Sequence, residues 1–276
     1  MLAGDVQTET NITCDLSITL DNIKIWMHEN RLKMNDSKTE FIIFGGKRAL
    51  QKSMTTSIRV GEATVQRSAN IKLLGLNIDE HLDLKYHIAC KARCASMSLF
   101  NLKKLSPHLT EKNRLKLVNA LVFSHMDYCN SLFINLPKHT LKPFQRIQNF
   151  AAKIVLGKSK YSSSTEALKH LHMLPVHVRC EFKLLVMVYK CLHGIAPTYL
   201  AELLHKHASA YCTRRSRQNL LDVPFTRKKT FADRSFSVAG PKLWNDLPEN
   251  ITSIDSLATF KKALKTYLFK RTFQNP

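Results

Sequence analysis

A regularly spaced set of basic side chains is the clearest sign of binding chemistry in this sequence. Four polar residues recur at i, i+4, i+7 and i+11: Lys142, Arg146, Asn149 and Lys153. This spacing places them in one stripe on a helix, opposite an apolar face. Further lysines extend the basic surface: Lys103, Lys104, Lys112 and Lys116 before the stripe, and Lys158 and Lys160 after it. Such an array contacts nucleic-acid phosphates without regard to base sequence and with strong salt dependence. A solvated face of an amphipathic helix is the alternative interpretation.

A second basic group lies in sequence that is typical of loops. Its members are Arg214, Arg215, Arg217, Arg227, Lys228 and Lys229. Clusters of this kind are typical of phosphate-binding arms and of nuclear import signals. A solvated basic loop explains the same residues equally well, so both interpretations stay open.

The net charge indicates what kind of partner these cations would meet. The chain has 276 residues and a formal net charge of +21. Residues 1–80 hold ten basic and ten acidic side chains, whereas residues 81–160 hold fourteen basic and only three acidic ones. A chain this basic predicts a polyanionic partner, either nucleic acid or an acidic membrane surface. Of these two we favour nucleic acid, as RNA, DNA or an RNA/DNA hybrid contacted mostly through phosphates, and we expect no membrane.

Several other kinds of chemistry lack their signatures. Seven cysteines, an odd and scattered set, predict reduced thiols in the nucleus or cytoplasm, and the first residues do not read as a secretion signal. The longest apolar run, Leu184–Tyr189, is too short to span a bilayer. No CxxC pair or zinc-finger spacing occurs, and Cys90 and Cys94 are expected to pack in a helical core. GxGxxG and GxSxG motifs are absent as well.

The hydrophobic pattern predicts an α+β fold. Before residue 80 we expect a helix over 15–30, a strand over 39–44, a hairpin over 57–67 and a strand over 70–79 that contains Gly75. The helix over 15–30 should turn Leu16, Leu20, Ile23 and Met27 inward.

After residue 80 the pattern becomes mainly helical. Helices are expected over 85–105, 111–133, 138–156, 164–172, 176–193 and 255–270. The helix over 176–193 is apolar on most sides and should form the core of the last part. Residues 207–250 suggest short strands, with Trp244 packing from an irregular loop. We expect three regions, over 1–80, 81–160 and 161–276.

Six sequence blocks together resemble the reverse transcriptases of LINE-type (non-LTR) retrotransposons. The first block, Trp26–Gly45, reads WMHENRLKMNDSKTEFIIFG, and its matching residues are Trp26, Asn30, Leu32, Lys33, Asn35, Lys38, Thr39 and Glu40. The second block contains Leu74-Gly75, Ile78-Asp79, Leu82 and His87-Ile88. Later blocks read LVNALVFSHMDYCNSLF, LPKHTLKPFQRIQNFAAKIV, LHMLPVHVRCEFKLLVMVYKCLHGIAPTYL and RSFSVAGPKLWNDLP. The likeness extends over essentially the whole chain.

The resemblance implies a palm remnant with a primer-grip hairpin, followed by a thumb and a mainly helical C-terminal region. Family enzymes are RNA-directed DNA polymerases that hold two Mg²⁺ ions between paired aspartates. Here the matching loop is Leu2-Ala3-Gly4-Asp5-Val6-Gln7, in which Gly4 replaces one aspartate. Asp5 alone cannot provide the oxygen ligands that Mg²⁺ requires. We therefore expect no catalysis and no cofactor in this chain, with the fingers and the rest of the palm lying before Met1.

Two further residues take candidate roles from the resemblance. Lys38 matches a lysine that faces the triphosphate of the incoming nucleotide, and a solvated lysine is the alternative. Gly75 matches the primer grip, where a glycine lets a nucleic-acid backbone approach closely, and a strand bulge is the alternative.

The leading functional hypothesis is a truncated reverse-transcriptase-like protein that binds RNA/DNA backbone through basic thumb-like helices without catalysis. A polymerase fragment that is active only with the missing upstream portion is the second hypothesis. A remnant of a mobile element without selected function is the third.

Overall fold

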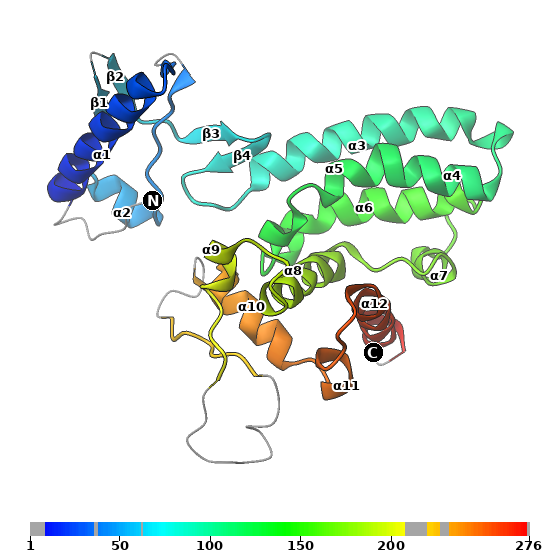
Figure 1. The fold of residues 1–276 in the computed structure, drawn as a ribbon. Coiled ribbons are helices and arrows are strands. Elements are labelled where there is room, and N and C mark those ends of the chain that lie inside the picture. Colours follow the sequence, from blue (N-terminus) through cyan, green and yellow to red (C-terminus); the bar gives the residue numbers. More distant parts are fainter. Residues whose placement is uncertain (1–8, 36–37, 62, 208–219, 227–231, 275–276) are drawn as a thin grey trace. The chain divides into compact units, whose positions relative to one another are not determined.

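The computed structural model describes residues 9–35, 38–61, 63–207, 220–226 and 232–274 (Figure 1). The chain divides into two compact units, Met1–His87 and Ile88–Pro276. Two small antiparallel hairpins near the N-terminus are followed by helices, so the predicted α+β class is confirmed.

The first unit contains a long helix, a short helix and two hairpins. Its elements are α1 (Glu9–Glu29), α2 (Lys47–Lys52), β1 (Ser57–Val60), β2 (Ala63–Gln66), β3 (Asn70–Leu73) and β4 (Leu76–Asp79). The predicted hairpin over 57–67 is confirmed, with Val60 opposite Ala63 across the turn. Gly61 has φ +64°, and a Cβ atom there would lie 1.7 Å from Lys24 Nζ of α1. The turn therefore needs glycine for its backbone angle, whereas the flexible end of the Lys24 side chain can move aside.

Helix α1 packs against β1 through a face that is only half-buried. Leu16, Leu20 and Met27, which were expected to point inward, are half-buried. Ile23 was also expected to point inward, but 43% of it is exposed. The apolar residues of α1 are spread around the helix, so the small hairpin covers only some of them.

Two strand predictions for the first unit are wrong. Residues 70–79 form the β3–β4 hairpin instead of one strand, because Leu74 and Gly75 both have positive φ, 48° and 82°. This pair of angles is typical of a type I′ turn, whose twist suits a two-residue hairpin. Residues 39–44 do not form a strand either: Phe41 makes a single bridge to Arg67. A strand needs a paired neighbour along its length, and the described residues provide one at that point only.

One carboxylate organises the turn between β4 and the next helix. Both oxygens of Asp79 accept hydrogen bonds from backbone N–H groups within residues 81–84, at 2.7–3.0 Å. His87 is fully buried, and its Nδ1 accepts a hydrogen bond from the backbone N–H of Asn77 at 3.2 Å. Asp79 and His87 therefore hold this turn in place, which is a structural reason for two residues of the second sequence block.

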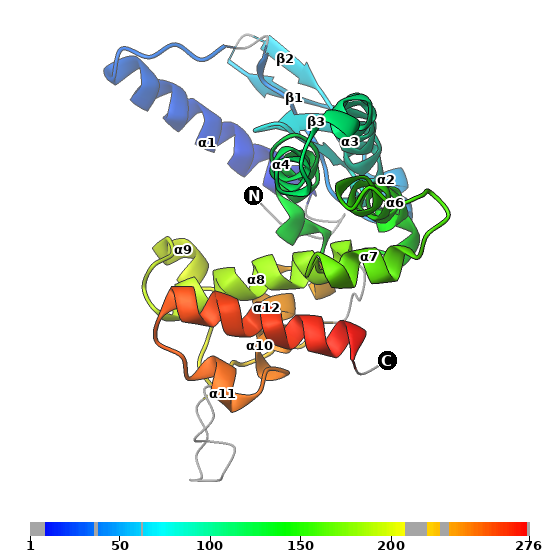
Figure 2. The ribbon, with the colours of Figure 1, turned by 90° about the vertical axis from the view of Figure 1, so that its right-hand side faces the viewer.

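The second unit begins with a group of long, closely packed helices (Figure 2). Its elements are α3 (Lys85–Leu105), η3 (Ser106–His108), α4 (Glu111–Leu117), the π-helix η4 (Val118–Phe123), α5 (Ser124–Asp127), η5 (Asn130–Phe133) and α6 (Lys138–Val155). The predicted helix over 85–105 is confirmed, and its buried face includes Ile88, Ala95 and Leu99, which are at most 2% exposed. The predicted helix over 111–133 instead ends at Asp127, and Cys129 with φ 55° turns the chain before η5.

A second helical group surrounds α8. It comprises α7 (Ser164–His170), α8 (Val176–Leu192), α9 (Thr198–Ala201), η7 (Ala232–Arg234), α10 (Phe236–Asn245), α11 (Glu249–Thr252) and α12 (Leu257–Phe273). Helix α8 contacts α6, α10 and α12, which confirms the predicted core helix. Its Tyr189 stacks on Phe260 of α12, with ring centroids 4.2 Å apart.

Trp244 is buried as predicted, but it lies on helix α10 and not in an irregular loop. The strands expected within 207–250 are replaced, in the described part of that segment, by α10, α11 and one bridge between Lys206 and Leu221. Gly240 explains why a helix fits here: a Cβ atom at this position would lie 3.0 Å from Val188 of α8. A small residue thus allows the two helices to approach closely.

Candidate nucleic-acid interface

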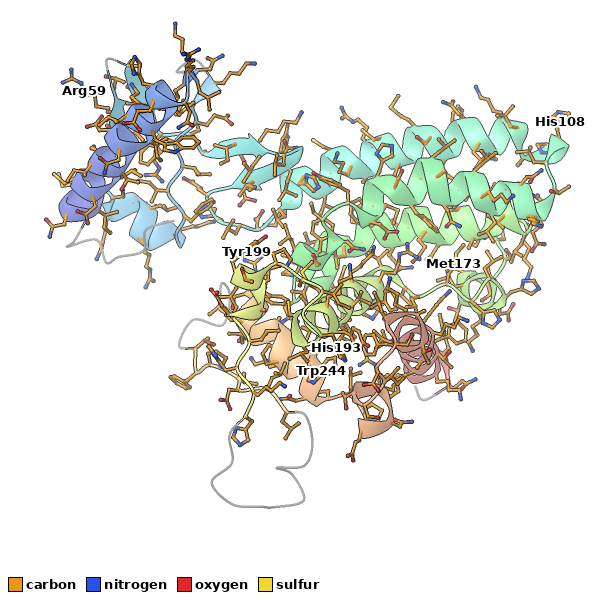
Figure 3. All side chains as sticks on the ribbon, in the orientation of Figure 1. Arg59, His108, Met173, His193, Tyr199 and Trp244 are labelled. Atoms are coloured by element: carbon orange, nitrogen blue, oxygen red, sulfur yellow. The ribbon has the colours of Figure 1, made fainter. Side chains whose placement is uncertain are left out.

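Three helix ends meet in the first helical group and bring most of the predicted cations together. Lys103 Nζ at the end of α3 lies 5.6 Å from the ring of Phe150 on α6. Arg114 of α4 donates a hydrogen bond to the carbonyl oxygen of Ile154 at 3.2 Å, next to the last residue of α6, and the chain then turns at Gly157 with φ +64°. The end of α3, the start of α4 and the end of α6 are therefore adjacent, near the labelled His108 in Figure 3.

We call the basic residues at these ends the helix-end cluster. Its members are Lys103, Lys104, Lys112, Lys116, Lys153, Lys158 and Lys160. All are exposed except Lys153, which is half-buried and donates a hydrogen bond to the carbonyl oxygen of Lys160 at 2.7 Å. No described carboxylate forms an ion pair with any member. Glu111 is the only acidic residue from 84 to 126, and none occurs from 128 to 165.

The predicted stripe on α6 is only partly part of this cluster. Lys142 and Arg146 are exposed, but Asn149 is half-buried and its side-chain oxygen accepts a hydrogen bond from Gln145. Lys142 lies about 16 Å from Lys153 along a helix that rises about 1.5 Å per residue. The stripe therefore runs from the helix-end cluster toward the start of α6. Its exposed polar surface is smaller in the middle, at the half-buried Asn149.

The remaining candidates belong to other parts of the chain. Lys38 and Gly75 belong to the first unit. Lys38 is exposed, and its backbone N–H donates to the carbonyl oxygen of Asn35 at 3.1 Å. Gly75 forms the β3–β4 turn, so the strand-bulge interpretation is wrong, and the neighbouring Leu74 is 86% exposed. Asp5 lies outside the described residues, as do the six basic residues of the predicted loop group, Arg214, Arg215, Arg217, Arg227, Lys228 and Lys229.

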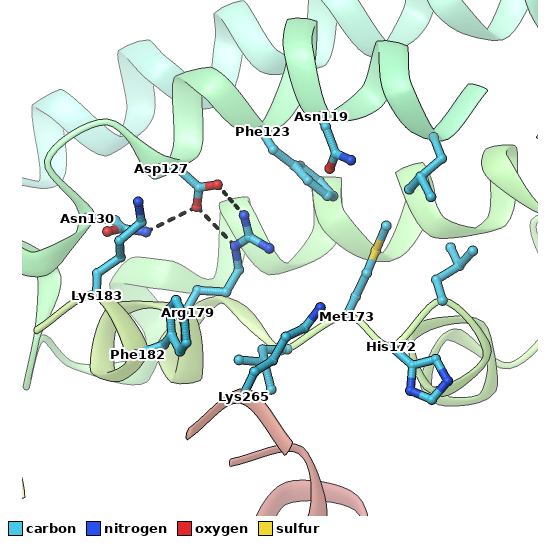
Figure 4. Close-up of a pocket in the computed structure, with 13 residues that line it drawn as sticks. Asn119, Phe123, Asp127, Asn130, His172, Met173, Arg179, Phe182, Lys183 and Lys265 are labelled. Carbon is cyan, nitrogen blue, oxygen red and sulfur yellow. Dashed lines mark hydrogen bonds and ion pairs between the residues drawn. The ribbon is translucent and has the colours of Figure 1, made fainter. Parts of the chain in front are cut away.

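A pocket of about 390 Å³ is lined by residues of both helical groups (Figure 4). It is closed at one side by an ion pair that sequence reasoning missed. Arg179 of α8 donates to both oxygens of Asp127, through Nε at 3.0 Å and through Nη2. Asn130 adds a third hydrogen bond to this carboxylate at 3.0 Å, and the guanidinium lies 5.1 Å from the ring centroid of Phe123. Both oxygens of the Asp127 carboxylate accept hydrogen bonds within the protein. We therefore interpret the Arg179–Asp127 ion pair as a structural link between the two helical groups.

The remaining chemistry of the described residues is limited. They contain no group of three or more His, Cys, Asp or Glu side chains arranged to hold a metal ion. The six cysteines among them are free thiols, and burial raises the pKa of the Cys180 thiol to about 12. Within the same described ranges, no helix is long and apolar enough to cross a membrane.

Comparisons of the chain with protein-family models, with curated proteins and with solved structures each found no match.

Proposed function

We propose that this protein binds the phosphate backbone of RNA, DNA or an RNA/DNA hybrid through the helix-end cluster. One observation carries the proposal: seven lysines from three adjacent helix ends form no ion pair with a described carboxylate. Holding like charges together in this way disfavours the folded state unless an anion offsets the repulsion. A nucleic-acid backbone supplies regularly spaced negative charges, and its binding releases condensed counterions.

The resemblance to LINE-type reverse transcriptases supports the same interpretation. In those enzymes the thumb, which would match the helical region after residue 80, holds the RNA/DNA duplex through its backbone. We propose for this chain the binding role alone, because Gly4 stands where the family has one of its paired catalytic aspartates. Backbone contacts carry no base information, so the proposed binding is independent of base sequence.

Salt-dependent binding of the full chain tests the proposal. Fluorescence anisotropy would measure its affinity for a labelled RNA/DNA hybrid between about 50 and 200 mM salt. We expect log K to fall linearly with log salt concentration, with a slope of about −0.9 for each phosphate that is neutralised. The triple variant Lys112→Glu, Lys116→Glu and Lys158→Glu should reduce the magnitude of the slope by about 2 to 3.

A matched control separates the cluster from the general charge of the chain. Lys261, Lys262 and Lys270 on α12 are exposed, and changing all three to Glu alters the net charge by the same amount. We expect this control to bind much more tightly than the cluster variant. Equal weakening in both variants, or an affinity that does not depend on salt, would overturn the proposal.

A further inference from the structure

Exposed aromatic rings alternate with the lysines of the helix-end cluster. Phe100 on α3 is 59% exposed, and Lys104 Nζ lies 4.8 Å from its ring centroid. Tyr161, beyond the end of α6, is 85% exposed, and Lys160 Nζ lies 4.9 Å from its ring centroid. Single exposed apolar side chains are common on protein surfaces. Here two large exposed rings lie in one basic surface, and each has the ammonium group of a neighbouring lysine over it. This is a more specific pattern.

Contacts connect the two rings across the surface. Lys103 follows Phe100 by one turn of α3 and lies over Phe150 of α6 at 5.6 Å. Lys153 lies one turn after Phe150, and its Nζ donates to the carbonyl oxygen of Lys160. The residues therefore form a continuous path from α3, across the end of α6, to the segment after it. We call this path, from Phe100 to Tyr161, the aromatic–lysine path.

The chemistry of this path fits a single strand of nucleic acid better than a duplex. An aromatic ring stacks on the face of a base, and a neighbouring ammonium contacts the phosphate of the same strand. In a duplex the base faces are already stacked on one another, and only edges and backbone are available to a protein. A single strand offers free base faces, and every base can stack, so such binding needs no particular sequence.

We propose that the aromatic–lysine path binds single-stranded RNA or DNA, with bases stacked on Phe100 and Tyr161 and phosphates held by the intervening lysines. This inference rests on the proposed nucleic-acid binding and names the substrate as an unpaired strand. It predicts that the protein prefers a single strand to a duplex of the same length and base composition.

Paired measurements on single and double strands test the inference. The full chain carrying Phe100→Ala and Tyr161→Ala should bind a labelled single strand about 5- to 100-fold more weakly for each ring removed. Its affinity for the duplex should change less than about 2-fold, because the lysines that contact phosphate remain. Tyr161→Phe keeps the aromatic face and should retain the affinity, whereas Phe100→Leu keeps only apolar volume and should not.

A matched control and a direct probe complete the experiment. Tyr199 on α9 is 65% exposed and lies outside the path, so Tyr199→Ala should leave both affinities unchanged. A single strand containing 2-aminopurine should lose fluorescence when wild-type protein stacks on it, and less so with the double alanine variant. Fluorescence of the buried Trp244 would verify that each variant is folded.

The outcomes distinguish this inference from the proposed function. Selective loss of single-strand binding in the double alanine variant supports it. Unchanged affinities would overturn the inference, and so would equal losses of affinity for the single strand and for the duplex. In either case the proposed binding of nucleic acid by the lysines would still stand. If the triple glutamate variant of the cluster binds the single strand and the duplex as tightly as the wild type does, the proposed function fails, and the inference fails with it.

Discussion

Two sets of basic side chains in the second unit differ in what surrounds them. Around α8, Arg179, Arg271 and Lys242 each pair with a carboxylate: Asp127, Glu181 and Asp233 respectively. At the helix-end cluster, seven lysines lie together without any such partner among the described residues. Cations around α8 therefore contribute to the link between helices, whereas those of the cluster are available to an external anion. Composition alone does not make this distinction, because each of these cations adds one positive charge to the chain whatever surrounds it.

The largest effect should follow from breaking the Arg179–Asp127 pair. Both side chains are 26% exposed, so the pair is largely removed from water. Asp127→Asn preserves shape but leaves the Arg179 guanidinium without its anion against Phe123. We expect the free energy of unfolding to fall by about 2 to 3 kcal/mol. Urea titration would measure it in a Trp26→Phe background, in which fluorescence reports only on the buried Trp244.

A carboxylate that takes part in no ion pair among the described residues provides the control for this change. Asp246 is exposed at the end of α10, and Asp246→Asn should alter the free energy of unfolding by less than about 0.5 kcal/mol. If Asp127→Asn proves as mild as this control, the pair does not link the two helical groups.

A smaller effect is expected at the second pair, between Arg271 on α12 and Glu181 on α8. Arg271 is 39% exposed, more than Arg179, and it donates one hydrogen bond to Glu181, whereas Asp127 accepts two from Arg179 and one from Asn130. Glu181→Gln should lower the free energy of unfolding by about 1 kcal/mol or less. The same urea titration would measure this loss, and high salt should reduce the difference from wild type. A loss larger than that of Asp127→Asn would contradict this ranking by number of hydrogen bonds.

Glu181 also affects the titration of His177, one turn earlier on α8. Partial burial lowers the pKa of the imidazole from 6.5, Glu181 opposes that shift, and Lys138 and Arg271 add to it. Glu181→Gln should therefore lower the pKa further. Because the folded pKa lies below the unfolded one, the unfolded chain binds more protons. The contribution of His177 to stability is thus complete above about pH 6.5 and decreases as pH falls through the lowered pKa.

Titration by NMR would check this shift. Imidazole signals of histidine-labelled protein would be followed against pH, with His177→Gln used to assign the resonance. A pKa of His177 at or above its ordinary value of 6.5 in wild-type protein would contradict the expectation. So would a pKa that rises in Glu181→Gln.

Local patterns in the sequence predicted the helices and their buried faces. Ile88, Ala95 and Leu99 recur at helical spacing, and helical spacing alone decides which residues share a face. The hydrophobic pattern did not show the β3–β4 turn, although the resemblance implied a hairpin at this block, because nothing about Leu74 marks a residue with positive φ, a conformation that glycine adopts far more readily. Trp244 was assigned to a loop because the helix around it depends on Gly240 fitting against α8, a tertiary contact.

The candidate site shows the same limit. The basic spacing on α6 could be seen in the sequence, and so could the basic pairs at the ends of its neighbours. That Lys153 would donate to the backbone of Lys160 could not be seen, because it depends on how the chain turns at Gly157. The Arg179–Asp127 pair joins residues 52 positions apart, and no local pattern indicates such a partnership.

The smallest effect on stability should come from the helix-end cluster itself. Lys112 and Lys158 are exposed and have no carboxylate partner among the described residues, so Lys112→Gln and Lys158→Gln remove repulsion without breaking a contact. We expect the free energy of unfolding to rise slightly, by less than about 0.5 kcal/mol for each change. Screening by added salt should raise the stability of wild-type protein more than that of the double variant, because less repulsion remains to be screened. A clear loss of stability in the double variant would show that these lysines hold the fold together, and the contrast with the paired cations around α8 would then disappear.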